Sequence, residues 1–203
     1  NLHDTDILIV DDNSPDGTGD IAAELTERDP RVYGLYRSRK GGLGTAYIAG
    51  FRWALERHYT HIFQIDADFS HDPAVLPVLL EATEHYDIAL GSRWIPNSKI
   101  EGWSYHRLFL SRLANIYARL LLRTNIHDLT GGYKCLRREV LETIELSRIT
   151  SVGYGFQIEI TWHAVQHGFT VAEIPITFSE RSTGKSKLSS STISEAFILV
   201  WKL

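Results

Sequence analysis

Short apolar runs alternate with longer amphipathic stretches through the first ninety residues. Runs of apolar and β-branched residues predict strands at 7–10, 32–36, 62–65 and 88–90. Apolar residues three or four apart predict helices at 18–28, 44–57 and 74–85. Strands that alternate with helices indicate βαβ units, so we expect an α/β domain with a mostly parallel sheet and ligands at the carboxyl ends of its strands.

The pattern changes after residue 90. The predicted elements are a helix at 105–123, a glycine-interrupted segment at 129–136, a helix at 156–167 and a strand at 171–176. Pro175 favours a sheet edge for that strand, because proline donates no hydrogen bond to a neighbouring strand.

The last 25 residues change from polar to apolar. Residues 179–191 are rich in polar side chains and predict a mobile loop. In 192–203, Ile193, Ala196, Phe197 and Val200 recur at helical spacing. This pattern is typical of a helix lying in a membrane interface, and a helix packed into the core is the competing interpretation.

Composition indicates a single domain with a sizeable core. The 203 residues are 43% hydrophobic and 23% charged, which is average for globular proteins. The only cysteine, Cys135, is expected to be a buried small residue in a reducing compartment. No apolar run of membrane-spanning length and no signal segment is present, and the lack of methionine indicates that the natural start is missing.

Charge is distributed unevenly along the chain. Residues 1–90 carry 7 basic and 16 acidic side chains, and the remainder carries 14 and 9. The stretch 91–123 has one acid, Glu101, against six bases. These are Arg93, Lys99, Arg107, Arg112, Arg119 and Arg123. We expect the first part to handle cations and this stretch to face anions, although solvated surface charge is an equally good explanation for much of the asymmetry.

The strongest chemical signal is Asp66-Ala67-Asp68, directly after the strand predicted at 62–65. Carboxylates that leave a strand end together can converge on one cation. Their hard oxygens suit Mg²⁺ or Mn²⁺, especially where substrate phosphates complete the coordination. D-x-D alone is a weak motif, and a capped strand end is its ordinary explanation.

Two further segments follow predicted strands. Asp11, Asp12 and Ser14 could hold the ribose or base of a nucleotide, or form an Asx turn before the next helix. The glycines around Gly42 could present backbone N–H groups to a phosphate at a helix start. They match neither the P-loop nor the Rossmann motif, so a tight packing turn is the favoured interpretation.

Eight sequence blocks resemble the family 2 glycosyltransferases of GT-A fold, and within them the dolichyl- and polyprenyl-phosphate mannose synthases, particularly actinobacterial ones. The blocks span the whole chain, and their order is more specific than any one of them. They are VDDNSPDGT (10–18), GLGTAY (42–47), DADFSHDP (66–73), GSRW (91–94), DLTGGYK (128–134), GYGFQIE (153–159), EIPITF (173–178) and RSTGKSK (181–187).

The resemblance implies inverting transfer of mannose from GDP-mannose to the phosphate of a polyprenyl or dolichyl carrier, at the cytoplasmic side of a membrane. A phosphate monoester is already an anion at neutral pH, so no general base is needed. The work of the protein is then to position the acceptor and to stabilise the departing diphosphate, with help from a divalent cation.

The resemblance also assigns roles to residues. The metal set is Asp66, Asp68 and Ser70, and the donor set is Asp11, Asp12, Ser14, Gly42, Asp66 and Ala67. The acceptor-phosphate set is Arg93, Arg107 and Ser111. The residues at the reaction centre are Asp68, Arg93 and Asp128, and the lid residues are Arg181, Lys185 and Lys187.

Two departures from the family pattern limit these expectations. The chain starts after the first strand of the family and its Pro-Thr-Tyr-Asn-Glu segment, so it is expected to be one catalytic domain truncated at its N-terminus, and possibly at its C-terminus. Ser70 stands where some relatives carry a glutamine metal ligand. A membrane-anchoring segment or a partner subunit is a further possible partner, and nucleic acid is not expected.

Two alternatives remain open at the level of sequence. One is the same acceptor chemistry with UDP-glucose or another nucleotide sugar. The other is a non-catalytic module that binds a nucleotide sugar or a lipid phosphate. The intact Asp66 and Asp68, together with Arg93, Arg107 and Ser111, argue against the second, because a binding remnant needs no complete reaction centre.

Overall fold

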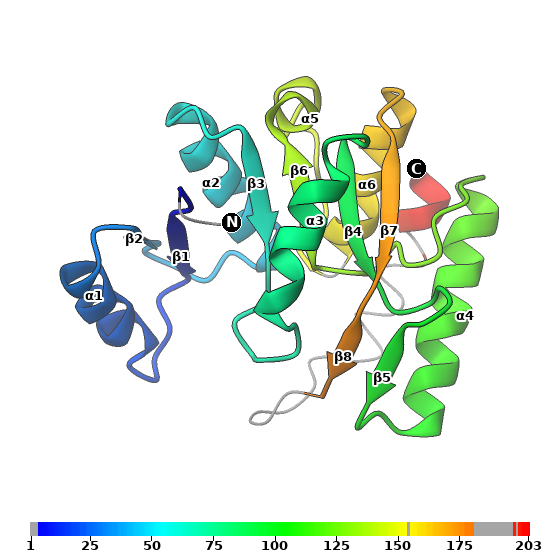
Figure 1. The fold of residues 1–203 in the computed structure, drawn as a ribbon, viewed down its shortest axis with the longest axis horizontal. Helices are drawn as coiled ribbons and strands as arrows, with labels where there is room; N and C mark the ends of the chain where they lie inside the picture. Colours follow the sequence, from blue (N-terminus) through cyan, green and yellow to red (C-terminus); the bar gives the residue numbers. More distant parts are fainter. Residues whose placement is uncertain (1–3, 154, 181–196, 198) are drawn as a thin grey trace.

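The structure, a computed structural model, describes residues 4–153, 155–180, 197 and 199–203 (Figure 1). Its strands are β1 (Ile7–Asp11), β2 (Val32–Tyr36), β3 (His61–Gln64), β4 (Ile88–Ser92), β5 (Lys99–Glu101), β6 (Lys134–Arg137), β7 (Val171–Pro175) and β8 (Thr177–Ser179). Its α-helices are α1 (Thr18–Arg28), α2 (Leu43–Glu56), α3 (Leu76–Ala82), α4 (Tyr105–Leu121), α5 (Arg138–Thr143) and α6 (Gly155–Gln166), and a 3₁₀ turn, η1 (Pro73–Val75), precedes α3.

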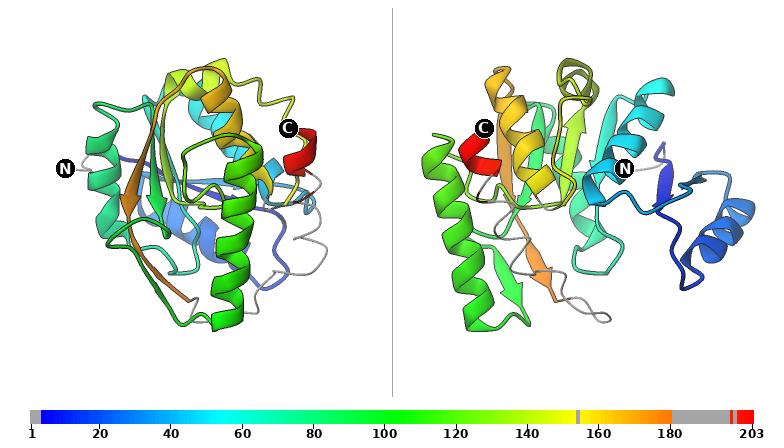
Figure 2. Two further views of the ribbon diagram at one scale, coloured as in Figure 1. Left: turned by 90° about the vertical axis from the view of Figure 1, so that its right-hand side faces the viewer. Right: turned by 180° about the vertical axis from the view of Figure 1, so that it is seen from behind.

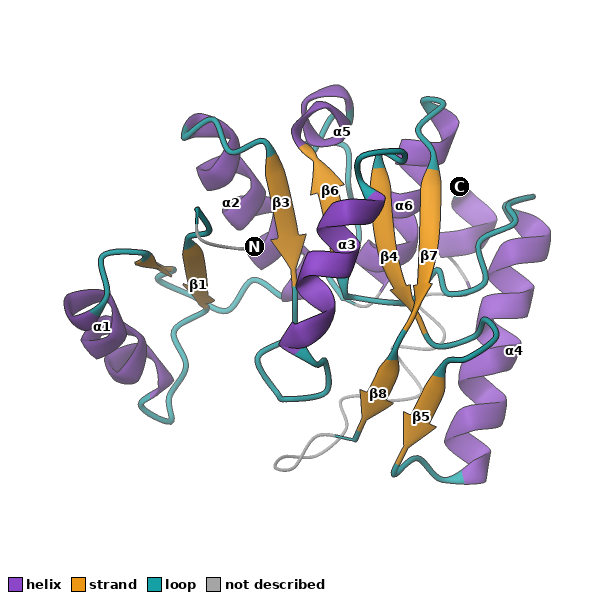
Figure 3. Cartoon of the chain, viewed as in Figure 1, coloured by secondary structure: helices purple, strands orange, loops and turns teal. Residues whose placement is uncertain are grey.

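The central sheet has four strands in the order β3-β6-β4-β7 (Figure 3). Strands β4 and β7 are parallel, whereas β6 runs antiparallel to both of its neighbours. Strands β1 and β2 form a separate parallel pair, and β5 pairs with β8 in a second one. The carboxyl ends of β3, β4 and β7 therefore lie at one edge, the lower edge in Figure 1.

Side chains on the two faces of this sheet enter different parts of the core. Helix α3 covers one face, where Leu79 packs with Ala89 and Cys135. Helices α2, α5 and α6 cover the other face, where Ile88 and Leu136 join their apolar residues, and Figure 2 shows α6 on the side opposite α3. Neighbouring residues of one strand thus face opposite layers, as the strand period of two requires.

The predicted helices and strands of the first ninety residues are present, with small shifts of their ends. The exception is the helix predicted at 74–85. Its α-helical part is shorter at both ends and consists of α3 alone. The carboxylate of Asp72 accepts a hydrogen bond from the N–H of Ala74 at 2.9 Å, and Pro73 then starts a 3₁₀ turn. At the other end the hydroxyl of Thr83 donates to the carbonyl of Leu80, a local bond that competes with helix continuation.

The second half differs more from the prediction. The glycine-interrupted segment contains β6, which enters the middle of the central sheet antiparallel to both neighbours, so this sheet is mixed and not mostly parallel as predicted. Strands β5 and β8 and helix α5 were not predicted. Strands β5 and β8 have three residues each and form only by pairing with each other across the sequence. Strand β7 lies at the sheet edge, which confirms the prediction from Pro175.

The C-terminal segment is described only in part. Residue 197 and residues 199–202 are helical, and Leu199 and Val200 are buried while Trp201 is exposed. The burial of Leu199 and Val200 is consistent with a helix packed into the core, and the membrane-interface interpretation of 192–203 stays a prediction. Most of the loop predicted at 179–191 lies outside the described residues. Among the described residues, no helix combines the length and the apolar character needed to cross a membrane.

Candidate active site

Asp66 and Asp68 follow β3 at the carboxyl edge of the central sheet. Tyr47, from α2, donates its hydroxyl hydrogen to Asp66 Oδ1 at 2.9 Å. A Cβ added to Gly132 would lie 3.5 Å from Gln157 Nε2 and 3.7 Å from Asp66 Oδ2, so Gly132 lies beside this carboxylate. Asp68 Oδ1 accepts hydrogen bonds from the N–H and the hydroxyl of Ser70, at 3.1 and 2.5 Å.

The donor set of this turn suits a hard divalent cation. Asp66 and Asp68 supply carboxylate oxygens, which Mg²⁺ and Mn²⁺ prefer. The described residues contain no cluster of three histidine, cysteine or acidic side chains that could hold a metal ion. A cation on these two carboxylates therefore needs further oxygens, and phosphates of a nucleotide are the usual source. The Ser70 hydroxyl, bonded to Asp68, orients that carboxylate.

A buried polar chain lies beneath Asp66. Lys134, at the start of β6, donates to the carbonyl of Gly131 and to Gln157 Oε1, both at 2.6 Å. The same Gln157 oxygen accepts a hydrogen bond from Gln64 Nε2 at 2.5 Å. Burial lowers the pKa of Lys134 to about 7, although the carboxylates of Asp128 and Asp66 favour its charged form. This chain ties β3, β6 and α6 together close to Asp66.

The acidic residues at the end of β1 are used in local structure. Asp11 Oδ2 accepts the N–H of Ser14, three residues on, at 3.2 Å, and the Asx turn before α1 is made by Asp16, whose Oδ1 accepts the N–H of Thr18 at 3.2 Å. Asp12 forms an ion pair with Arg37 at 2.7 Å and accepts the N–H of Gly41 at 3.1 Å. Contact of Asp11, Asp12 and Ser14 with a nucleotide stays a prediction.

Gly42 begins α2 in a tight turn. Its φ is +92°, and an added Cβ would lie 2.3 Å from a methyl carbon of Val152. The N–H of Gly44 donates to the Val152 carbonyl at 2.9 Å, so the helix start is locked against the segment before α6. Buried Glu159 holds that segment by accepting the N–H groups of residues 150 and 151. The favoured interpretation of a packing turn is therefore consistent with the geometry.

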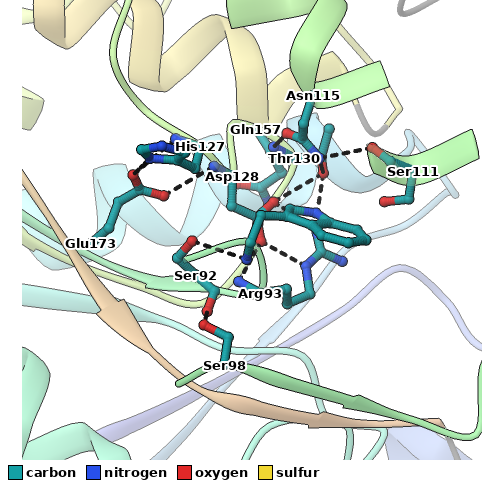
Figure 4. A network of polar contacts seen from close by, with 12 residues as sticks. Ser92, Arg93, Ser98, Ser111, Asn115, His127, Asp128, Thr130, Gln157 and Glu173 are labelled. Atoms are coloured by element: carbon teal, nitrogen blue, oxygen red, sulfur yellow. Dashed lines mark hydrogen bonds and ion pairs between the residues drawn. The ribbon is translucent and has the colours of Figure 1, made fainter. Parts of the chain in front are cut away.

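Arg93 and Asp128 form a buried, two-pronged ion pair (Figure 4). Arg93 Nε and Nη2 each lie 2.7 Å from an Asp128 oxygen, and the Arg93 backbone N–H donates to the same carboxylate at 2.9 Å. Burial alone would raise the pKa of Asp128, but the charge and hydrogen bonds of Arg93 outweigh it and lower that pKa. Asp128 is thus an ionised anchor for Arg93.

Further hydrogen bonds orient this pair. Thr130 accepts from Arg93 Nη2 at 2.8 Å, and Asn115 of α4 bonds both Thr130 and the carbonyl of Ser111. Glu173 of β7 accepts the backbone N–H groups of His127 and Asp128, at 2.8 and 3.0 Å. The backbone around Asp128 is therefore fixed from both sides.

Arg107 and Ser111 lie four residues apart on α4, as predicted. The hydroxyl of Ser104 accepts the Arg107 N–H and caps this helix. The Arg107 guanidinium pairs with Glu180 at 2.8 Å and lies over the indole ring of Trp103, 4.0 Å from its centroid. Arg93 lies against the same ring at 5.6 Å. The fold thus brings Arg93, Arg107 and Asp128 into one cluster.

The predicted metal set and the predicted acceptor-phosphate set lie near each other. Burial lowers the pKa of the Arg93 guanidinium, but Asp128 outweighs that effect and, with a smaller contribution from the carboxylate of Asp66, raises it. Arg181, Lys185 and Lys187 lie outside the described residues. Cys135 is buried, as predicted, and burial raises its thiol pKa to about 12.

Several residues of the site were not singled out from the sequence. These are Arg37, Gln64, Trp103, Asn115, Thr130, Glu173 and Glu180. Thr130 and Glu173, like Tyr47, Lys134 and Gln157, occur in the family blocks, but no pattern assigned them a contact. Position within a block was thus a usable signal for these five, whereas Trp103 carried none.

In this α/β domain, two carboxylates at a strand end lie near a guanidinium cluster, an arrangement whose chemistry suits phosphorylated substrates. Residues 2–145 match the family described as Glycosyl transferase family 2. The chain belongs to this family, it has the GT-A fold, and it is a glycosyltransferase.

Curated relatives are similar over nearly the whole chain. The polyprenol monophosphomannose synthase of Mycolicibacterium smegmatis is 52% identical over 196 residues, which cover 96% of this chain and 74% of the relative. The undecaprenyl-phosphate mannosyltransferase of Micrococcus luteus is 46% identical over 197 residues, or 97% of this chain and 81% of the relative.

Solved structures agree on the fold at low sequence identity. The glucosyl-3-phosphoglycerate synthase of Mycobacterium tuberculosis, solved with Mn²⁺, UDP and glucosyl-3-phosphoglycerate, matches with a TM-score of 0.68 and 16% identity over 97% of this chain and 68% of its own. A mycobacterial protein matches with a TM-score of 0.70 and 15% identity over 97% of this chain. This chain spans 64% of the length of that protein.

Proposed function

We propose that this glycosyltransferase transfers mannose from GDP-mannose to the phosphate of a polyprenyl or dolichyl phosphate, with inversion at the sugar. The names of the two curated relatives, at 52% and 46% identity, support prenyl phosphate as acceptor and mannose as the sugar. The observation that carries the proposal is the guanidinium cluster of Arg93 and Arg107 next to Asp66. The anionic acceptor requires guanidinium groups, and the diphosphate of the donor requires a cation held by carboxylates. The two kinds of charge must therefore lie side by side.

The state of Asp128 supports a mechanism without a protein base. Its two oxygens are engaged by Arg93, and its pKa is lowered, so it is a poor proton acceptor. A phosphate monoester carries about −1.5 to −2 charges at pH 7 and can attack without losing a proton to the enzyme. Arg93, Arg107 and Ser111 hold that phosphate in this proposal, and Asp128 keeps Arg93 in place.

Asp66 and Asp68 would hold Mg²⁺ or Mn²⁺, and Ser70 orients Asp68 or adds a weak third contact. A bound cation would act as a Lewis acid that stabilises the departing diphosphate. Solved neighbours of the same fold contain Mn²⁺ or Mg²⁺ together with UDP, which supports a divalent cation in this class. Asp11, Asp12, Ser14, Gly42 and Ala67 are the proposed contacts to the rest of the donor.

Helix α4 supports a membrane surface as a further partner. Five large apolar side chains form one stripe on its outward face, at i, i+4, i+8, i+11 and i+15. They are Tyr105, Phe109, Leu113, Ile116 and Leu120, with exposed fractions of 92, 66, 46, 38 and 67%. The helix has no acidic residue, and Arg112, Arg119 and Arg123 flank the stripe. We propose that this face rests on an anionic lipid surface on the cytoplasmic side.

A transfer assay tests the reaction. GDP-mannose and UDP-glucose are offered in parallel with a short polyprenyl phosphate and Mn²⁺, and the anomeric configuration of the product is determined. Mannosyl transfer with inversion is expected. Transfer from UDP-glucose alone would replace the proposed donor, and retention of configuration would overturn the mechanism. Asp68→Asn should weaken Mn²⁺-dependent donor binding while the fold persists, and an unchanged titration would remove Asp68 from the metal site.

A further inference from the structure

Trp103 lies between the two arginines of the acceptor cluster. It occupies the loop between β5 and α4, one residue before the helix cap. The Arg107 guanidinium carbon is 4.0 Å from the centroid of its ring, and the Arg93 carbon is 5.6 Å away. Phe178 of β8 meets the ring edge-on at 5.3 Å and contacts Arg93 as well, at 5.4 Å. One indole therefore touches groups from three separate parts of the fold.

The contacts of this indole are made through its aromatic surface. Its N–H is buried, and it has no hydrogen-bond partner among the described residues. A buried indole N–H without a partner is costly, so the position is favoured by other contacts. Attraction of guanidinium groups to the ring and the edge-on contact with Phe178 are the ones present.

The ring and the carboxylates restrain the arginines in different ways. Asp128 and Glu180 bind in-plane N–H groups of Arg93 and Arg107, which are the groups that a phosphate also uses. A guanidinium that lies over a ring is held by its face, so the ring itself does not occupy the in-plane N–H groups. A phosphate that arrives at Arg107 would compete with Glu180 but not with Trp103.

We propose that Trp103 is a positioning residue for the acceptor, and that it holds the Arg107 and Arg93 guanidinium groups in one arrangement that fits a phosphate monoester. This inference rests on the proposed function, which makes these two arginines ligands of the acceptor phosphate. Trp103 acts on acceptor recognition through the arginines and leaves the donor side, at Asp66 and Asp68, unaffected.

The test uses Trp103→Leu and Trp103→Phe, with Trp53→Leu as the matched control. Trp53 makes an equivalent contact, with Arg57 at 4.2 Å from its ring, on α2 and outside the acceptor cluster. We expect Trp103→Leu to raise the acceptor KM, and the dissociation constant of a short polyprenyl phosphate measured by calorimetry, by about 2- to 30-fold, which corresponds to about 0.5 to 2 kcal/mol. Trp103→Phe should recover part of this loss, and the donor KM should stay within about twofold.

A double-mutant cycle separates positioning from general destabilisation. In an Arg107→Ala background, Trp103→Leu should have a smaller effect on acceptor binding, because one of the groups that it positions is absent. Equal losses in both backgrounds would overturn the inference. So would a rise in donor KM that matches the rise in acceptor KM, or equal losses in Trp53→Leu.

Failure of the proposed function has a different signature. A wild-type chain that binds the polyprenyl phosphate without transferring sugar to it would overturn the reaction, while the calorimetric comparison of Trp103 and Trp53 variants still decides the inference. A wild-type chain that does not bind the lipid phosphate would refute the acceptor itself and, with it, the inference that depends on it.

Discussion

Replacement of Asp128 by asparagine should destabilise the fold far more than an average substitution. Asp128 is fully buried, and the Arg93 side chain that it pairs with is 10% exposed. Asp128→Asn keeps the shape but leaves the Arg93 charge without its counter-ion. Breaking a buried pair in this way costs about 3 to 5 kcal/mol. For a domain of this size each kcal/mol lowers Tm by about 2 to 4 °C, so the expected loss is roughly 6 to 20 °C.

Thermal and urea unfolding at neutral pH measure this loss. Glu24→Gln is the matched control, because Glu24 forms an ion pair with Arg28 in which the two side chains are 63% and 74% exposed. Exposed pairs contribute little, so Tm should change by at most about 2 °C. Arg93→Lys should be intermediate, since it keeps the charge and loses the two-pronged geometry.

The effect of Asp128 should also depend on pH in one direction. Its folded pKa is lowered from 3.8, so the unfolded chain binds the proton more readily. The stabilisation that Asp128 contributes is therefore fully present above the unfolded pKa of 3.8. It is lost as the pH falls through the lower, folded pKa. The difference between wild type and Asp128→Asn should shrink in this acidic range.

One result would refute this reasoning. If Asp128→Asn unfolds within about 1 kcal/mol of wild type and still loses several orders of magnitude in kcat, the carboxylate acts on the reacting groups. Its pairing with Arg93 would then be secondary, and the proposed mechanism without a protein base would need revision.

Three further changes test other parts of the site. The free energy of unfolding should rise between about pH 7 and 10.5, because the neutral amine of Lys134 is favoured only in the folded chain. Lys134→Met should flatten this rise in urea unfolding. An unchanged slope would contradict a lowered pKa at Lys134. Gly44→Ala would place a Cβ 2.3 Å from the Ser151 carbonyl oxygen, so it should lower Tm and raise the donor KM. Gly50→Ala on the same helix, where the nearest contact is 3.4 Å, should be neutral or stabilise the fold by about 0.5 to 1 kcal/mol in the same assays. Equal effects of the two variants would count against a locked helix start. Tyr47→Phe removes the hydroxyl that bonds Asp66 and should weaken Mn²⁺-dependent GDP binding by about 10- to 100-fold in calorimetry, and full retention would show that Asp66 needs no such support.

The order of most elements was predictable from the chain alone. Apolar periodicity located the strands and helices of the first ninety residues to within a few positions, and Pro175 predicted an edge strand. Hydrophobic period is a local property, so it can be read from neighbouring residues without knowledge of the fold. The position of Asp66 and Asp68 after a strand was predictable for the same reason.

The contacts within the candidate site were decided by tertiary structure. Asp128 pairs with Arg93 across 35 residues, and Arg107 with Glu180 across 73. Lys134 is fully buried in the middle of a sheet, where lysine is rarely found, because Gly131 and Gln157 satisfy its amine there. No local pattern carries such information.

The same limit explains the strands that were missed. Strands β5 and β8 have three residues each. A strand this short has too few residues to show a period, and it is stable only when its backbone groups bond to a neighbouring strand. The sequence by itself determined which side chains could bind a cation or a phosphate. The long-range pairing of the chain determined which of them meet, because ion pairs, stacked rings and strand ladders depend on distance in space.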